Sequence, residues 1–323
     1  MESITSIAEI LSAIKKNKRR LKTSFLILTV SFWSIICYGQ TAIEYFNSGN
    51  LKFNLGDYRG ALADYDKAIE INFNDAEIYS IRGVTKYFLS DDRGAIADYN
   101  KAIEINPNDS TAYLNRGILK DKLGDYRGAI ADFNKAIEIT PDFADMYYNR
   151  GTVKGKLSDS NGAIADYNKA IEINPNYAEA YNDRGNAKND LSDYMGALAD
   201  YNKAIEINPK FVEVYCNRGM VKGNISDYMG AIADYNKAIE INPKFAEAYC
   251  SRGNAKGHLS DYMGALADFN KAIEINPKSA EAYYSRGVLK YNLKDKDGAC
   301  LDWSKAGELG FKEAYEIIRK TCN

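Results

Sequence analysis

The sequence predicts an all-α solenoid made of eight repeats, each 34 residues long and each folded as two helices. The repeats run from residue 42 to residue 313 without a gap, and the pattern of residues 178–211 returns nearly unchanged at 246–279. A fixed period of this length is typical of solenoids. Apolar residues inside each repeat recur at steps of three and four, which is the period of an α-helix. Because one repeat cannot bury its apolar face alone, stacked neighbours must supply the core.

Small and aromatic residues occupy fixed positions in every repeat, counting from position 1 at Ala42. Position 8 is always Gly, positions 20 and 27 are always Ala, position 4 is always Tyr, and position 24 is always aromatic. In the fifth repeat, for example, Gly185 and Ala197 are the small residues at positions 8 and 20, and Tyr201 is the aromatic residue at position 24. We expect the small residues to let the two helices of a repeat approach closely, with the aromatic rings filling the wider part of the contact.

Two signals mark where the helices of a repeat end. Near Leu191-Ser192-Asp193, a small residue followed by Asp suits the end of one helix and the N-cap of the next. All six prolines of the chain lie at position 32, and the second helix should stop before this position because proline cannot continue it.

This pattern of small, aromatic and proline positions resembles the tetratricopeptide repeat family over residues 42–313. The resemblance implies a right-handed superhelix of helix pairs. It also implies that the first helix of each pair lines a concave wall, and that this wall binds a peptide or a protein.

The charge is divided unevenly along the chain. Residues 1–39 carry six Lys or Arg and two Glu, a net charge of +4, which leaves −6 on the remaining residues because the whole chain carries −2. A negatively charged repeat array is a poor candidate for binding nucleic acid. We therefore predict no nucleic-acid partner.

The N-terminal segment reads as a basic head followed by an apolar run. Basic residues between Lys15 and Lys22 precede an uncharged stretch at 23–43, whose apolar core has the length found in signal peptides. Cleavage after Gly39 would leave Gln40 as the new N-terminus. An uncleaved membrane anchor is the competing interpretation, because the uncharged run approaches the length of a membrane span, and a buried helix of the soluble fold is the third. The first two both predict export, with the repeats periplasmic or anchored facing the periplasm of a bacterial envelope.

The C-terminus and the cysteines lead to two further expectations. Residues 314–323 begin with an apolar stripe of Ala314, Ile317 and Ile318, and we expect a helix that caps the last repeat, with a frayed tail as the alternative. The five cysteines are odd in number and form no CxxC pair, and Cys216 and Cys250 lie at the same position of adjacent repeats. Stacked helices about 8–10 Å apart exceed the usual disulfide span, so the thiols are interpreted as unpaired.

Three charged positions recur through the repeats. Position 7 is Arg in seven repeats, position 11 is Lys in all eight, and position 23 is Asp in all eight, as in Arg184, Lys188 and Asp200. One interpretation is a basic track for an anionic polymer. The favoured one is a ladder of ion pairs that joins the two helices, each exposed pair contributing about 0.2–1 kcal/mol.

The variable positions of the first helices, chiefly 5, 9 and 12, are the candidates for partner binding. Their earlier members are apolar or aromatic and their later members include several Asn. Aromatic side chains are common anchors in protein interfaces, although these positions also suit solvated helix surfaces. The predicted partner-binding groove consists of Phe46, Asn50, Phe53, Tyr87, Leu114, Ile118, Tyr148, Asn182, Asn186, Met220, Asn254, Tyr284 and Tyr291.

An enzyme is not predicted. The only histidine, His258, lies eight residues from Cys250 on one helix, about 12 Å away along the axis and too far for a nucleophile–base pair. Sixteen of the 24 glycines lie at positions 8 and 19, and no Gly-rich phosphate loop occurs. We predict no metal and no cofactor, and a non-catalytic scaffold that binds a protein or peptide in its groove. A groove for a non-protein envelope ligand such as a glycan is the alternative.

Overall fold

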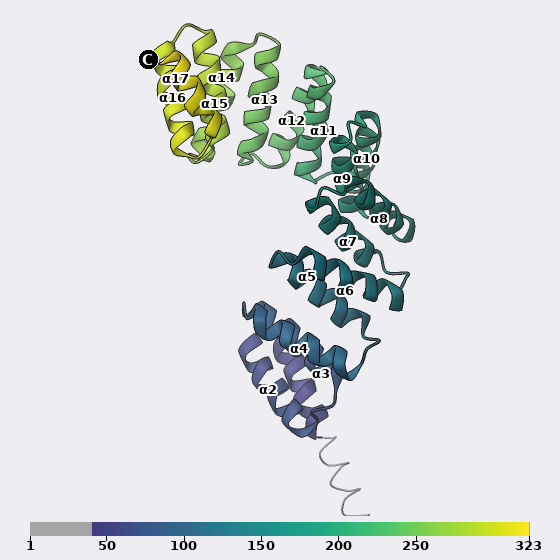
Figure 1. Cartoon of the computed structure of the whole chain (residues 1–323). Helices are drawn as coiled ribbons and strands as arrows, with labels where there is room; N and C mark the ends of the chain where they lie inside the picture. The colour runs from purple at the N-terminus through teal and green to yellow at the C-terminus, as the bar shows by residue number, and fades with distance from the viewer. Residues whose placement is uncertain (1–40, 323) are drawn as a thin grey trace, which may run out of the picture. The chain divides into compact units, whose positions relative to one another are not determined.

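The chain folds into successive helix pairs, as predicted. The structure is a computed structural model that describes residues 41–322, and no strand occurs among these residues. The described residues divide between 141 and 142 into two compact parts, here called the N-terminal part and the C-terminal part. Within each part, neighbouring helices pack in chain order (Figure 1). The all-α solenoid is confirmed.

Each repeat supplies a first and a second helix. The first helix of repeat one spans residues 41–54 within the described part of the chain. The first helices of the later repeats are α3 (Ala76–Phe88), α5 (Ser110–Lys122), α7 (Ala144–Lys156), α9 (Ala178–Asp190), α11 (Val212–Asn224), α13 (Ala246–His258) and α15 (Ala280–Asn292). The second helices are α2 (Tyr58–Ile71), α4 (Asp92–Ile105), α6 (Tyr126–Ile139), α8 (Ser160–Ile173), α10 (Tyr194–Ile207), α12 (Tyr228–Ile241), α14 (Tyr262–Ile275) and α16 (Lys296–Glu308).

The predicted contact between the two helices of a repeat is present. Ala197, Tyr201 and Ala204 on α10 are fully buried. A Cβ atom added to Gly185 on α9 would lie 2.7 Å from a ring carbon of Tyr201, which is too close for two carbon atoms. The glycine at position 8 therefore makes room for the aromatic ring at position 24 of its own repeat.

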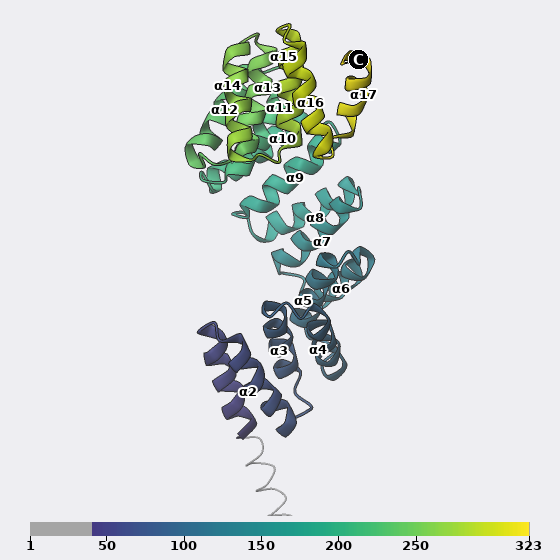
Figure 2. The same cartoon turned by 90° about the vertical axis from the view of Figure 1, so that its left-hand side faces the viewer.

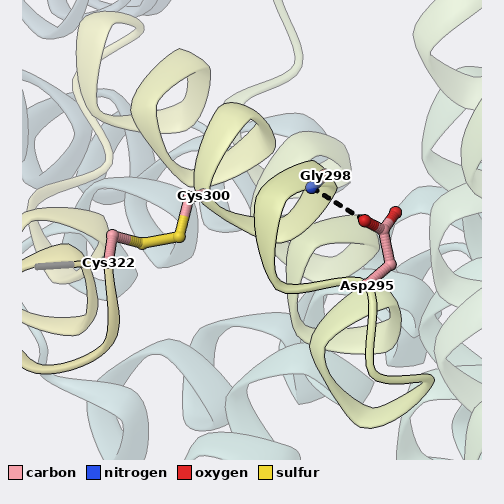
Figure 3. The surroundings of a disulfide bond; sticks show 4 residues. All are labelled: Asp295, Gly298, Cys300 and Cys322. Atoms are coloured by element: carbon pink, nitrogen blue, oxygen red, sulfur yellow. Dashed lines mark hydrogen bonds between the residues drawn. A yellow bond between two sulfur atoms is a disulfide. The ribbon is translucent and has the colours of Figure 1, made fainter.

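The turn between the two helices has the predicted caps. The side chain of Asp193 accepts a hydrogen bond of 3.0 Å from the backbone N–H of Gly196, which satisfies one of the free donors at the start of α10. Figure 3 shows the same arrangement in repeat eight, where Asp295 accepts from Gly298 at 2.9 Å. A Cβ atom at Gly196 would overlap the capping carboxylate, which explains the glycine at position 19.

Ser192 closes the first helix in a left-handed backbone conformation, with a φ of 63°. Its N–H donates to the carbonyl of Asn189 at 2.8 Å, and the N–H of Asp193 donates to the carbonyl of Lys188 at 2.9 Å. These two bonds form the Schellman motif, for which glycine is the preferred residue. Gly56 and Gly124 occupy the same position in repeats one and three.

Ser192→Gly is therefore expected to raise the free energy of unfolding by about 1 kcal/mol, because glycine adopts positive φ without a Cβ clash. Thermal and chemical denaturation measure the change. Ser304→Gly is the matched control, since Ser304 is exposed within α16 and glycine lowers stability inside a helix. A loss of stability in both variants would contradict the assignment of strain to Ser192.

A further helix, α17 (Lys312–Thr321), packs beside α16 (Figures 1 and 2). Its predicted apolar stripe faces the last repeat: Ala314 is fully buried in a cluster with Trp303, and Ile317 and Ile318 pack against that cluster. Helix α17 therefore covers the face of the last repeat that no further repeat packs against.

The interpretation of all thiols as unpaired is wrong for two of them. Cys300 on α16 and Cys322 after α17 form a disulfide, with their Cα atoms 5.8 Å apart (Figure 3). The disulfide forms because α17 folds back onto α16, a contact that does not exist between equivalent positions of stacked repeats. Cys216 and Cys250 are free and buried, and burial first, then nearby glutamates, raises the pKa of each to about 12.

Candidate functional site

The charged positions form the predicted ladder. In repeat five, Nε of Arg184 donates to Oδ2 of Asp200 at 2.9 Å, and Nη2 donates to the other carboxylate oxygen. Nζ of Lys188 lies 2.8 Å from the same carboxylate. The remaining nitrogen Nη1 of Arg184 donates to Asn168 of the preceding repeat at 2.6 Å. Arg184 thus joins the two helices of its own repeat to the second helix of the repeat before it.

The ladder is more buried than expected. The side chain of Asp200 is 5% exposed and that of Arg184 is 16% exposed, so these are not surface ion pairs. The guanidinium carbon of Arg184 also lies 5.2 Å from the centre of the Tyr181 ring, which adds a cation–π contact. Because the guanidinium donors of Arg184 are already bonded inside the fold, the arginines at position 7 do not form a track for an anionic polymer. The same Arg–Asp pair recurs as Arg82–Asp98, Arg116–Asp132, Arg150–Asp166, Arg218–Asp234, Arg252–Asp268 and Arg286–Asp302.

In the N-terminal part, several predicted groove residues pack inside the fold. The ring of Phe53 lies 5.3 Å from that of Tyr58 and 5.5 Å from that of Phe88. Asn50 accepts a hydrogen bond of 2.7 Å from the hydroxyl of the buried Tyr65. These contacts hold the two helices of repeat one together and pack them against α3 of repeat two. Of the other predicted residues in this part, Phe46 is half-buried, Leu114 is buried, and Tyr87 and Ile118 are exposed.

In the C-terminal part, three predicted residues gather around one carboxylate, Asp183 on α9. The hydroxyl of Tyr148 on α7 donates to Asp183 at 2.9 Å, and the amides of Asn182 and Asn186 donate to it at 2.9 and 3.4 Å. Asn186 also accepts from the hydroxyl of Tyr201 at 2.8 Å. The bond from Tyr148 to Asp183 thus ties the first helices of repeats four and five together, and Asn182 and Asn186 hold the carboxylate from its own helix.

Burial shapes the electrostatics of this network. Burial, which is the largest cause, raises the pKa of Asp183 above its usual value, although hydrogen bonds from Tyr148 and Asn182 oppose the rise. Burial and the neighbouring carboxylate of Asp183 also raise the pKa of Tyr148, so its hydroxyl keeps its proton and serves as a donor. Asp183 was not singled out from the sequence, because its partner Tyr148 is 35 residues away in the preceding repeat.

Two predicted residues lie near the C-terminal end of the repeats. The ring of Tyr284 packs against that of Phe311 with centroids 4.5 Å apart, and the ring of Tyr291 lies 5.7 Å from that of Trp303. Tyr284 is half-buried under the capping helix, whereas Tyr291 is 45% exposed.

The remaining two predicted residues, Met220 and Asn254, line pockets in the C-terminal part. Pocket A has a volume of about 440 Å³ and is lined by residues of α11, α12 and α13, with Glu281 of α15. Pocket B has a volume of about 400 Å³ and is lined by residues of α13, α14 and α15. Asn254 and His258 line both pockets, so α13 forms the wall between them.

Glycines at position 12 open these pockets. Cβ atoms built on Gly223 and Gly257 would meet no atom within 4 Å, in contrast to the glycines at position 8. Gly223 lines pocket A and Gly257 lines pocket B. The ring of His258 is stacked on Tyr228 with centroids 4.6 Å apart, which holds the shared wall in place. His258 and Tyr228 were not among the predicted groove residues, and the glycines at the variable position 12 were the signal for open space beside them.

The described residues show no arrangement for a metal or a membrane span. Among residues 41–322, no group of three or more His, Cys, Asp or Glu side chains is placed to hold a metal ion. Over the same residues, no helix has the length and apolar character needed to cross a membrane. The basic head and nearly all of the uncharged run at 23–43 lie outside the described residues.

Comparison with family profiles decides the family. Matches to a family described as "TPR repeat" cover residues 49–89, 91–124, 122–158, 156–190, 185–224 and 226–260, and one described as "Tetratricopeptide repeat" matches residues 246–279. The chain belongs to the tetratricopeptide repeat family. Tetratricopeptide repeats generally mediate protein–protein interactions, and the family is typically non-catalytic.

Solved structures share this repeat fold. A tetratricopeptide repeat protein from Parabacteroides merdae is 23% identical, with a TM-score of 0.64 over 77% of this chain and 99% of that one. The C-terminal part of a TPR protein from Cytophaga hutchinsonii is 20% identical, with a TM-score of 0.61 over 74% and 98%. YrrB, described as a TPR protein with an unusual peptide-binding site, is 28% identical, with a TM-score of 0.50 over 57% and 95%. A comparison with curated proteins finds no match.

Proposed function

We propose that this tetratricopeptide repeat protein is a non-catalytic scaffold that binds a peptide segment of a partner protein along its first helices. The observation that carries the proposal is the pair of adjacent pockets A and B, which open on the first helices of repeats six to eight. Pockets of several hundred Å³ that combine apolar walls with a few polar groups are typical binding sites. The peptide-binding site named for YrrB supports the same kind of ligand.

Direct binding of a purified partner tests this function. The full chain serves as bait, captured proteins are identified by mass spectrometry, and each purified candidate is titrated by calorimetry. We expect a short linear fragment of the true partner to retain most of its affinity. If no captured protein binds directly and the chain is retained on a polysaccharide column, the scaffold proposal is wrong and the glycan alternative takes its place.

A matched pair of methionine variants locates the binding surface. Met220 on α11 is exposed and lines pocket A, and Met195 on α10 is exposed outside both pockets. Met220→Ala should weaken binding of the partner, because methionine supplies adaptable apolar contact, whereas Met195→Ala should leave it unchanged. The reverse result would move the binding surface to the second helices.

We also propose that the repeats are exported, either periplasmic after cleavage or anchored through residues 23–43. The basic head followed by an uncharged run supports export. The disulfide Cys300–Cys322 supports it independently, since disulfides persist in oxidising compartments. A reporter active only outside the cytoplasm, fused after Thr41, should be active, and the same reporter without residues 1–40 should be inactive. Activity of a cytoplasm-only reporter in the first fusion would contradict export.

A further inference from the structure

A row of three glutamates reaches pocket A, because its last member, Glu281, lines that pocket. Glu213, Glu247 and Glu281 occupy position 2 of repeats six, seven and eight, at the start of α11, α13 and α15, and all three are exposed. Within residues 41–322, none of these three carboxylates pairs with a Lys or Arg side chain. Burial, and then the negative charges of Glu281 and Glu213, raises the pKa of Glu247 above its usual value. A cation placed along this row would relieve the mutual repulsion of the glutamates.

Pocket B is lined mainly by apolar side chains, and pocket A combines apolar and polar ones. Tyr228 and Tyr235 line pocket A, and Phe269, Val288 and Leu289 line pocket B. Glu281 lines pocket A beside Tyr228 and Tyr235, so a negative charge and apolar walls belong to one surface there. Such a surface suits a ligand that offers apolar side chains next to positive charge.

The usual spacing of packed helices matches one turn of an extended peptide. Pockets A and B lie on either side of α13, and adjacent packed helices are about 8–10 Å apart. A peptide in the polyproline II conformation has three residues per turn and rises about 3.1 Å per residue, so every third side chain points the same way at about 9 Å. Residues three apart in such a peptide can therefore enter both pockets.

We propose that pockets A and B bind a cationic linear peptide, with two apolar side chains three residues apart in the pockets and Lys or Arg side chains against Glu213, Glu247 and Glu281. This inference rests on the proposed scaffold function and names the chemistry of its partner. Asn254 and Ser285, which line the pockets, supply hydrogen-bonding groups for the peptide backbone between the two anchors. The stacked ring of His258 separates the anchors.

A synthetic peptide library tests the chemistry directly. Each labelled peptide has apolar residues at two fixed positions three apart, with lysine beside each, and binding to the full chain is measured by fluorescence anisotropy. We expect members of the library to bind, and the same peptides with glutamate in place of lysine to lose at least about tenfold in affinity. Glu247→Gln with Glu281→Gln should weaken binding and reduce its dependence on salt.

Filling the pockets tests the site. Gly257→Leu and Gly223→Leu each place a side chain in open space within pocket B or pocket A, and each should lower peptide affinity by about tenfold or more. Gly155→Leu is the matched control, because Gly155 lies at position 12 of repeat four, in open space outside both pockets, and should bind like the unmodified chain. We expect all three variants to fold, because leucine favours a helix more than glycine does. Melting curves check this.

The outcomes separate this inference from the broader function. If no library member binds, if the glutamate peptides bind equally well, or if both pocket variants bind like the Gly155→Leu control, the proposed site or its charge preference is wrong. The scaffold function would still stand if a captured protein partner bound directly to the chain. Absence of every direct protein partner would overturn both proposals.

Discussion

Arg184→Met is expected to lower the free energy of unfolding by about 3 kcal/mol, because removing one partner of a buried ion pair leaves an incompletely compensated charge. The carboxylate of Asp200 is 5% exposed and would keep only Lys188 as a cationic partner among residues 41–322. Methionine keeps much of the apolar stem of arginine, so the loss reports on the guanidinium group. The substitution also breaks the bond to Asn168 in the preceding repeat, so stacking of repeats four and five should weaken as well.

Chemical denaturation measures the loss, and hydrogen exchange should locate it in α8, α9 and α10. Asp200→Asn and the double variant complete a double-mutant cycle, in which we expect a coupling of about 2 kcal/mol. Lys203→Met is the matched control, because the pair Lys203–Glu206 lies on the surface and is expected to contribute nothing measurable. Equal small effects of Arg184→Met and Lys203→Met would contradict the conclusion that the ladder holds the repeats together.

The sequence predicted the features that depend on one repeat and its period. The pairing of Arg184 with Asp200, the cap at Asp193 and the space at Gly185 all follow from positions that recur every 34 residues. Repetition shows which positions are fixed, and their spacing on two adjacent helices shows which can meet. The depth at which the ladder lies was underestimated, because burial depends on how the neighbouring repeat covers it.

Features made between repeats were harder to predict. Tyr148 was proposed as an anchor for a partner, but the structure gives its hydroxyl an internal acceptor, Asp183, in the next repeat. A partner role for Tyr148 stays a prediction. Pockets A and B also depend on neighbours: Gly257 leaves space on α13, but only the packing of α14 and α15 shows that no side chain fills it. The glycine at position 257 therefore indicated open space on α13, but the residues that line pocket B could not be predicted from it.

The C-terminal disulfide could not have been predicted from repeat geometry, because Cys322 lies after the last repeat and approaches Cys300 only when α17 folds back. Replacing both residues by alanine is expected to lower the stability of the capped end by roughly 3 kcal/mol. The two cysteines are 22 residues apart, and a crosslink that closes such a loop restricts the unfolded chain. The effect should be local. Contacts in a repeat array run between neighbours, so α17 and α16 should lose protection from hydrogen exchange while α10 and α12 keep theirs.

Reduction provides an independent route to the same state. A reducing agent should lower the melting temperature of the unmodified chain towards that of Cys300→Ala/Cys322→Ala, and it should leave the double variant unchanged. Cys250→Ala is the matched control, because Cys250 is a free, buried thiol: its substitution should not alter the response of the chain to reduction. Alkylation followed by mass spectrometry checks the bond itself. If Cys300 and Cys322 are alkylated without prior reduction in protein purified from an oxidising compartment, the disulfide is wrong, and the capping helix must be held by the packing of Ala314, Ile317 and Ile318 alone.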